Sequence, residues 1–240
     1  EFGRLGITLG RNGELKVEIP GKLWSLKDNF HTFEIKRRRL GLFVYSEQLP
    51  RDARENLVKD YAEVVRVGMA SNPNMTTNMM RILYLDISPT VRKYVGQNEN
   101  TDENTLEILA KDSERDVRLT VAGNPSTPLH VLERMAVNRD EAMRIEVCKN
   151  AGASPALLLG MIFDDNVDVR TATASHESVP PSGLLKLSTD EELAVRQAVV
   201  RNPNTTPEAL KRLSFDKVDY VRALARKRMA DILKDQIEED

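Results

Sequence analysis

Residues 112–139 read DSERDVRLTVAGNPSTPLHVLERMAVNR, and the pattern that they carry returns every 26 residues along most of the chain. Its clearest mark is a column of arginines at that interval: Arg66, Arg92, Arg118, Arg144, Arg170, Arg196 and Arg222. A fixed period of this size is typical of supersecondary units that stack into a solenoid. The period therefore predicts the architecture from about residue 51 onward.

Further columns keep the same register. Six residues before the arginines come Asp60, Asp86, Asp112, Asn138, Asp164, Asp190 and Asp216. Six residues after them come Asn72, Asn98, Asn124, Asn150, His176, Asn202 and Arg228. An apolar residue precedes each arginine, and two more apolar columns follow, one of them Met80, Leu106, Leu132, Leu158, Leu184 and Leu210. We expect the apolar columns to form the core between units.

Within one unit, the pattern predicts two short helices. Asp112 and Ser113 are residues that cap a helix N-terminus, and Gly123 or Asn124 is able to end that helix in a left-handed conformation ahead of Pro125. A second helix is expected to begin near Pro128. The last unit lacks the Asn-Pro turn, which predicts one longer terminal helix over about 220–237.

Residues 1–50 lie outside this register and favour strands. Residues 7–9 and 15–19 alternate in polarity, and the Asn12-Gly13 pair between them is a strong hairpin signal. Residues 33–35 and 42–45 are further strand candidates. We expect a small β-rich segment that either covers the open end of the solenoid or acts as a separate module. The predicted division is thus residues 1–50 and residues 51–240.

Composition narrows the class of protein. A single cysteine excludes an internal disulfide framework and a multi-cysteine metal site. No apolar run reaches the length of a membrane span, and the first residues carry no signal-peptide pattern. A cytoplasmic location without membrane contact is the expectation. The formal net charge of −2 provides no general basic field for nucleic acid.

The units resemble those of the leucine-rich repeat variant family. The resemblance rests on a Val-Arg helix, an Asn-Pro-x-Thr-Pro turn and a Leu-rich second helix, as in residues 117–132 and again in residues 195–210. It covers about residues 51–230, and the Asp-to-Val-Arg part is also similar to HEAT-type repeats. It implies a right-handed, mainly α solenoid of about six to seven units, whose short second helices are of α or 3₁₀ type. The resemblance implies no catalytic residues. One member of the family has a cysteine-rich iron–sulfur segment, but this chain has a single cysteine, so no cluster is inferred for it.

The arginine column has two interpretations. A row of arginines could follow the phosphates of a nucleic acid. Alternatively, each guanidinium pairs with an aspartate of its own or a neighbouring unit, which would satisfy both groups inside the protein. The near one-to-one match of Arg with Asp favours the internal ladder. The asparagine column is likewise interpreted as turn chemistry.

Two further features are candidate binding sites. Leu159 and Leu185 occupy a position where other units carry charge, so together they could form an exposed apolar patch for a protein partner. Local burial is the alternative. The basic run Lys36, Arg37, Arg38 and Arg39 could contact nucleic acid or an acidic partner, or could be a solvated strand edge.

No catalytic constellation emerges from the sequence. Cys148 stands in a column of small residues and is expected to be inert core, and the three histidines share no metal-ligand spacing. No cofactor is expected, and the protein is predicted not to be an enzyme. The expected function is a non-catalytic scaffold for protein–protein interaction. The alternative is a solenoid that binds nucleic acid through basic residues, and the oligomeric state stays open.

Overall fold

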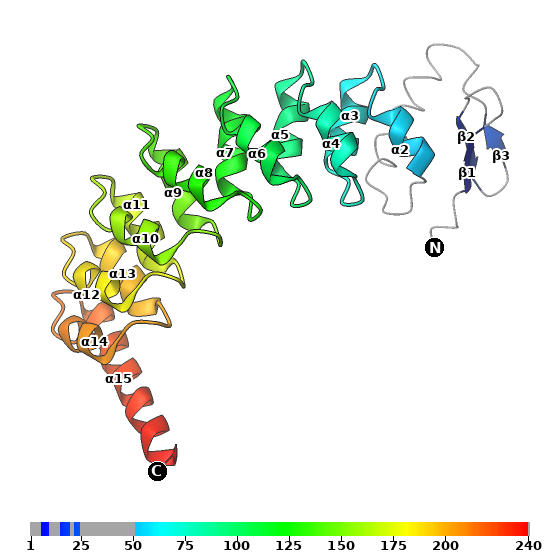
Figure 1. The fold of residues 1–240 in the computed structure, drawn as a ribbon. Helices are drawn as coiled ribbons and strands as arrows, with labels where there is room; N and C mark the ends of the chain where they lie inside the picture. The colour runs from blue at the N-terminus through cyan, green and yellow to red at the C-terminus, as the bar shows by residue number, and fades with distance from the viewer. Residues whose placement is uncertain (1–5, 10–14, 20–21, 25–50, 240) are drawn as a thin grey trace. The chain divides into compact units, whose positions relative to one another are not determined.

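The computed structural model describes residues 6–9, 15–19, 22–24 and 51–239. Its contacts divide the chain into two compact units, Glu1–Ser126 and Thr127–Asp240. From Arg51 onward the described residues form helices in tandem, joined by short turns (Figure 1). The predicted mainly α repeat fold is confirmed.

In the first unit, α2 (Arg51–Leu57) leads into two helix pairs and a further helix. The pairs are α3 (Glu63–Ala70) with α4 (Thr77–Leu83), and α5 (Pro89–Gln97) with α6 (Glu103–Leu109); α7 (Arg115–Gly123) follows. The first helix of each repeat packs against the first helix of the next repeat, α3 on α5 and α5 on α7. The repeats therefore stack through equivalent faces, as a solenoid requires.

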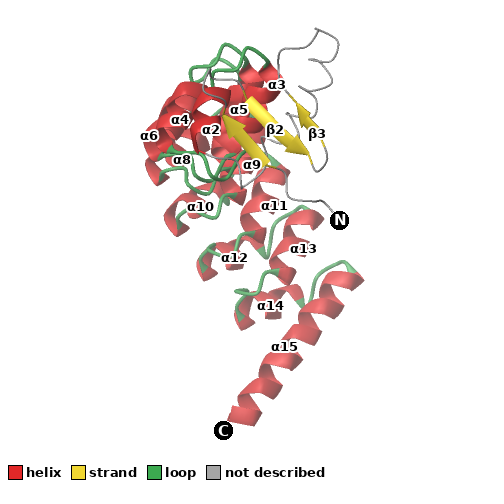
Figure 2. Cartoon of the chain, turned by 90° about the vertical axis from the view of Figure 1, so that its right-hand side faces the viewer, coloured by secondary structure: helices red, strands yellow, loops and turns green. Residues whose placement is uncertain are grey.

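The second unit continues the same alternation. Its helices are α8 (Leu129–Ala136), α9 (Glu141–Lys149), α10 (Pro155–Met161), α11 (Val167–Ser175), α12 (Pro181–Leu187), α13 (Leu193–Arg201), α14 (Pro207–Leu213) and α15 (Asp219–Glu239). Figure 2 shows α10, α12 and α14 in one row and α11 and α13 in another. The shorter helices of the first row are α-helical, which settles the α-or-3₁₀ alternative for them.

The predicted apolar columns form the core. Each member of the column from Met80 to Leu210 has no exposed surface, and Val91, Val117 and Val195, which precede column arginines, are equally buried. Burial of one such side chain contributes about 2 kcal/mol. Isolated helices of seven to nine residues are unstable in water, so this packing between repeats stabilises them.

The helix ends differ in part from the prediction. Asn124 ends α7 with φ −75° and ψ 124°, an extended conformation instead of the left-handed one expected at this turn. Pro125 explains the difference, because a residue before proline is driven into the extended region. Asp112 lies two residues before the N-cap position and accepts the N–H of Glu114, the N-cap residue of α7, at 2.9 Å.

Both ends of the chain bear on the predictions. The long terminal helix is confirmed as α15, which buries Val221 and Ala225. Strands β1 (Gly6–Leu9) and β2 (Leu15–Ile19) pair antiparallel as expected, and β3 (Lys22–Trp24), which the sequence did not indicate, pairs with β2. The strand candidates at 33–35 and 42–45 lie outside the described residues. The boundary near residue 50 and the capping role stay predictions.

Candidate interaction surface

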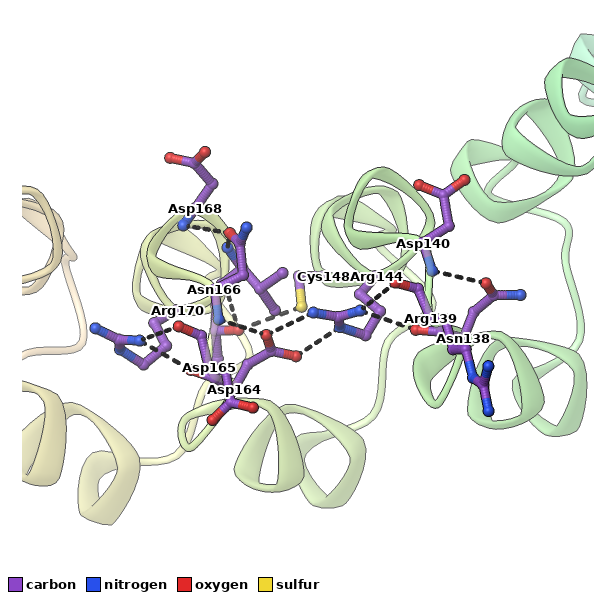
Figure 3. Close-up of polar contacts among 12 residues, drawn as sticks. Asn138, Arg139, Asp140, Arg144, Cys148, Asp164, Asp165, Asn166, Asp168 and Arg170 are labelled. Atoms are coloured by element: carbon purple, nitrogen blue, oxygen red, sulfur yellow. Dashed lines mark hydrogen bonds and ion pairs between the residues drawn. The ribbon is translucent and has the colours of Figure 1, made fainter.

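The arginine column forms an ion-pair ladder between neighbouring repeats. In the second unit, Nε of Arg144 lies 2.7 Å from Oδ2 of Asp164, and its Nη2 lies 2.8 Å from Oδ1 (Figure 3). The same fork-to-fork contact joins residues 20 positions apart in four further pairs: Arg66–Asp86, Arg92–Asp112, Arg170–Asp190 and Arg196–Asp216. Bidentate pairs of this kind are the strongest ionic hydrogen bonds in proteins.

Each ladder arginine also holds its own repeat together. Nη1 of Arg144 donates to the backbone carbonyl of Asn138, and Nη1 of Arg170 donates to that of Asp164, both at 2.8 Å (Figure 3). The equivalent bond six residues back recurs at Arg66, Arg92, Arg118, Arg196 and Arg222. The guanidinium groups are thus engaged inside the repeats, which confirms the internal ladder and weakens the interpretation as a phosphate track.

The environment of the ladder carboxyls favours their charged form. Partial burial acts to raise the pKa of Asp86, Asp112, Asp164, Asp190 and Asp216, but the arginine hydrogen bond, a backbone N–H and the guanidinium charge outweigh it. The net result is a pKa below the ordinary value for each carboxyl. The ladder therefore makes folding depend on pH.

We expect the free energy of unfolding to stay level near neutral pH and to fall once the pH drops below about 4, the ordinary pKa of aspartate. A carboxyl whose pKa is lower in the folded state stabilises the fold above the unfolded pKa, and this contribution is lost as the pH falls through the folded pKa. Urea unfolding followed by circular dichroism from pH 7 to pH 3 measures it. In an Asp190→Asn variant the decline should be shallower; an equally steep decline would assign it to other carboxyls.

A second ladder runs through the buried asparagines. Nδ2 of Asn202 donates to the carbonyls of Ala174 and His176 in the preceding repeat, at 2.8 and 3.0 Å. Its Oδ1 accepts the N–H of Asn204 at 2.9 Å. Asn98 makes the same three bonds in the first unit. The prediction of turn chemistry is confirmed, with an added link between repeats that the sequence did not indicate.

His176 takes the place of asparagine in this ladder. Its Nδ1 accepts the N–H of Ser178 at 2.9 Å, and its Nε2 lies 3.1 Å from the carbonyl oxygen of Asn150. Because Nδ1 faces a donor, Nε2 carries the proton and donates to Asn150. His176 is therefore a structural variant of the turn. At the last position of the column, Nη1 of Arg228 donates the equivalent hydrogen bonds to the backbone carbonyls of Val200 and Asn202.

We expect His176→Asn to leave stability unchanged or to raise it by up to about 1 kcal/mol, because asparagine restores the two-carbonyl contact made by the other members. His176→Ala should cost about 1–2 kcal/mol, since it leaves the Asn150 carbonyl and the Ser178 N–H without this partner. Thermal and urea unfolding of the two variants side by side make the measurement. Equal losses in both variants would show that the imidazole itself is required.

Cys148 is fully buried on α9, beside the Thr173 hydroxyl of α11 at 3.2 Å. Burial raises the pKa of its thiol to about 11, although the Thr173 hydrogen bond acts to lower it. A thiol with so high a pKa carries almost no thiolate at neutral pH, so the prediction of an inert core cysteine fits its position.

An aromatic disulfide reagent should therefore leave native Cys148 unmodified for hours at pH 7.5 and modify it at once in denaturant. The absorbance of the released thiolate reports both rates. Prompt modification of the native protein would show that α9 and α11 separate readily.

A hollow of about 800 Å³ opens beside Cys148, between α9 and α11. Thr171, Ala172 and Ser175 line this hollow, and their small side chains leave space between the two helices. Its titratable neighbours include Lys149, Asp168 and His176. Among the residues that the structure describes, no group of His, Cys, Asp and Glu is placed to hold a metal ion. No described helix is long and apolar enough to cross a membrane.

The predicted patch at Leu159 and Leu185 is only partly accessible. Both side chains are half-buried, on α10 and α12. Cδ2 of Leu159 would lie 3.2 Å from a Cβ built on Gly183, so it packs against the next repeat. Their role in binding stays a prediction. Lys36, Arg37, Arg38 and Arg39 lie outside the described residues, so their predicted contact with nucleic acid or an acidic partner also stays a prediction.

More strongly exposed apolar side chains lie at another position of the repeat, which the sequence analysis did not predict as a site. Val137, Phe163 and Phe215 each stand directly before a member of the aspartate column, with exposed fractions of 82%, 67% and 77%. In the first unit, Leu85 holds the same position and is 71% exposed. In the sequence this position is apolar in four repeats and holds Lys59, Lys111 or Thr189 in the others, so the signal is weaker than that of the core columns.

The first unit has its own apolar surface around Leu85. Leu85 and Ile108 line a hollow of about 460 Å³ together with Tyr84 and Lys111. Ile87, two residues after Leu85, is almost fully exposed. Large apolar side chains that gather at one exposed place are typical of interaction surfaces.

Comparison with known proteins supports the repeat assignment. Residues 115–140 match the family model described as leucine rich repeat variant. A solved structure described as a leucine-rich repeat variant with a novel repetitive protein structural motif is 25% identical, with a TM-score of 0.57 over 82% of this chain and 83% of that one. YibA of Escherichia coli is 14% identical over 81% of this chain and 97% of its own, with a TM-score of 0.45. The comparison with curated proteins gave no match.

The matched segment spans the Val-Arg helix, the Asn-Pro turn and the Leu-rich second helix on which the resemblance rests. The ladder and core contacts of the described repeats recur at the same 26-residue register before and after it. Residues 115–140 thus match the leucine-rich repeat variant model, and the chain resembles the leucine-rich repeat variant family in its repeat and in its helical solenoid fold.

Proposed function

We propose that the protein is a non-catalytic scaffold that binds other proteins. The observation that carries this proposal is the contrast between the two kinds of column. The side chains of the arginine, aspartate and asparagine columns form contacts between repeats. The apolar side chains at Val137, Phe163 and Phe215 instead face solvent. Stacked repeats present such exposed positions at regular intervals, which suits recognition of another chain. A cytoplasmic location, with Cys148 as a free thiol, belongs to the same proposal.

The test is capture of partners from source-cell lysate by the immobilised chain, after nuclease treatment and at about 50 mM and about 200 mM salt. We expect specific proteins to be retained under all conditions and to be lost with a Phe163→Glu, Phe215→Glu variant that unfolds at the same temperature as wild type. The Leu159→Glu, Leu185→Glu variant tests the half-buried pair in the same experiment. Capture of nucleic acid that washes off with salt, with no retained protein, would contradict the scaffold and support the alternative.

A further inference from the structure

In the second unit, one edge of the solenoid carries a recurring set of apolar and basic side chains. We call it the basic–apolar edge, and it consists of two positions in each repeat, one near the end of the second helix and one in the turn after it. The first position holds Arg134, Lys186 and Arg212, and the second holds Val137, Phe163 and Phe215. The remaining member of the first position is Gly160, and the remaining member of the second is Thr189. In a chain with 37 acidic against 35 basic residues, this composition is a marked local bias.

The two positions of the edge touch across repeats. Nζ of Lys186 lies 5.8 Å from the centre of the Phe163 ring, although 23 residues separate them. An ammonium at this distance from an aromatic ring makes a cation–π contact. Lys186 remains exposed, so its charge is available to a carboxylate while its ammonium lies over the ring.

The apolar members of the edge are unusually open. Phe163 and Phe215 are 67% and 77% exposed, and a Cβ built on Gly160 would meet nothing within 4 Å. Half-buried Leu159 and Leu185 lie next in sequence to Gly160 and Lys186 and continue the apolar character inward. Single exposed apolar residues are ordinary on protein surfaces, but recurrence at one repeat position beside cations is typical of a binding site.

We propose that the basic–apolar edge docks an acidic–apolar peptide segment of a partner protein, which deepens the scaffold function proposed above and rests on it. Leu, Phe or Trp side chains of the peptide would pack on Phe163 and Phe215. Its Asp or Glu side chains would pair with Lys186 and Arg212. Arg212 makes an exposed contact with Glu208, 3.1 Å away, and such surface pairs exchange readily.

The spacing argues for a peptide over a single-stranded nucleic acid. Phe163 and Phe215 are two repeats apart, about 20 Å if stacked helices lie about 10 Å from one another, whereas bases of a strand stack on closely spaced aromatic rings. The ladder arginines already bind aspartates, so they add no phosphate contacts. With a net charge of −2, the chain does not attract a polyanion at long range, while a short peptide needs only the local charge.

The experiment selects binders of the immobilised chain from a random 12-residue peptide library displayed on phage. We expect enriched sequences in which Asp or Glu stands within a few residues of Leu, Phe or Trp. A fluorescein-labelled peptide from this set should bind at least tenfold more weakly to a Lys186→Glu, Arg212→Glu variant, measured by fluorescence anisotropy. A Phe163→Ser, Phe215→Ser variant should show a comparable loss.

The matched control is Lys149→Glu, Lys227→Glu, which makes the same change in charge at exposed positions outside the edge. It should bind the peptide as wild type does, and circular dichroism establishes that every variant is folded. No enrichment, enrichment without acidic residues, or equal weakening by the control would overturn the proposal. Tighter binding of labelled oligo-dT than of peptide, lost in the edge variants, would overturn it in favour of nucleic acid. Proteins captured from lysate by both wild type and edge variants would leave the scaffold standing while the edge is rejected.

Discussion

Replacement of Arg196 by alanine is expected to lower the free energy of unfolding by about 3–5 kcal/mol, the range measured when one partner of a buried ion pair is removed. Arg196 and Asp216 form the most buried pair of the ladder, with side chains 6% and 4% exposed. The substitution deletes both guanidinium bonds to Asp216 and leaves that carboxylate with the N–H of Val218 at 2.8 Å. It also removes the bonds from Arg196 to the carbonyls of Asp190 and Glu191.

The position of Asp216 in the chain predicts which part of the fold the Arg196→Ala substitution loosens first. Asp216 lies between α14 and α15, so loss of the pair separates the terminal helix from the repeat that contains α13. Hydrogen exchange should therefore show the largest loss of protection in residues 207–239, before the rest of the second unit opens, because repeats couple mainly to their neighbours. Urea unfolding gives the total loss in free energy.

Arg212→Ala is the matched control, because the pair that Arg212 makes with Glu208 is exposed and its loss should cost less than about 0.5 kcal/mol. Arg196→Lys should fall between the two, since an ammonium cannot form the two-pronged contact. If Arg196→Ala cost no more than Arg212→Ala, the ladder would not stabilise the stack, and its role would be confined to setting the register of repeats.

The sequence was most informative where one residue type repeats for one physical reason. The columns at Leu132 and Val117 predicted the core because burial demands an apolar side chain in every repeat. The pairing of arginine with aspartate was also predictable, because matched charges in register satisfy one another. Which repeat supplies the aspartate was left open by the sequence, because the choice depends on how one repeat packs on the next.

The one mistaken detail, the conformation of the turn, arises where a local rule has more than one solution. The turn at Asn124 was expected to use a left-handed residue, but the following proline imposes an extended one, and the buried side chain of Asn124 takes on the hydrogen bonding. The emphasis on Leu159 and Leu185 came from their contrast with charged residues in other repeats. Leu159 packs near Gly183 of the next repeat, which a single column does not reveal, and the role of both leucines in binding stays a prediction. The more exposed Phe163 and Phe215 lie in a column interrupted by Lys111 and Thr189, so periodicity alone did not distinguish it.

Replacement of Asn202 by alanine tests the second ladder and is expected to lower the free energy of unfolding by about 3 kcal/mol. The side chain is 3% exposed and makes three backbone hydrogen bonds, to the carbonyls of Ala174 and His176 and from the N–H of Asn204. Alanine leaves these groups without that partner in a place that water reaches poorly, and an unsatisfied buried polar group costs about 1–3 kcal/mol. Asn202→Asp should be nearly as damaging, because a carboxylate accepts where the two carbonyls need a donor.

Asn204→Ala provides the comparison for this substitution in the same turn. Asn204 is exposed, and its Nδ2 donates to a single carbonyl, that of Glu177 at 2.6 Å, so its loss should cost less than about 1 kcal/mol. Urea unfolding of the variants gives the free energies, and exchange of the backbone N–H groups of α11 and α13 locates the weakened junction. Asn202→Ala should cost more than Asn204→Ala by a clear margin, and the loosening should start where α11 meets α13. A uniform loss of protection across the second unit, with similar costs for both asparagines, would mean that the turn stabilises the fold through its backbone conformation instead of through the side-chain amide.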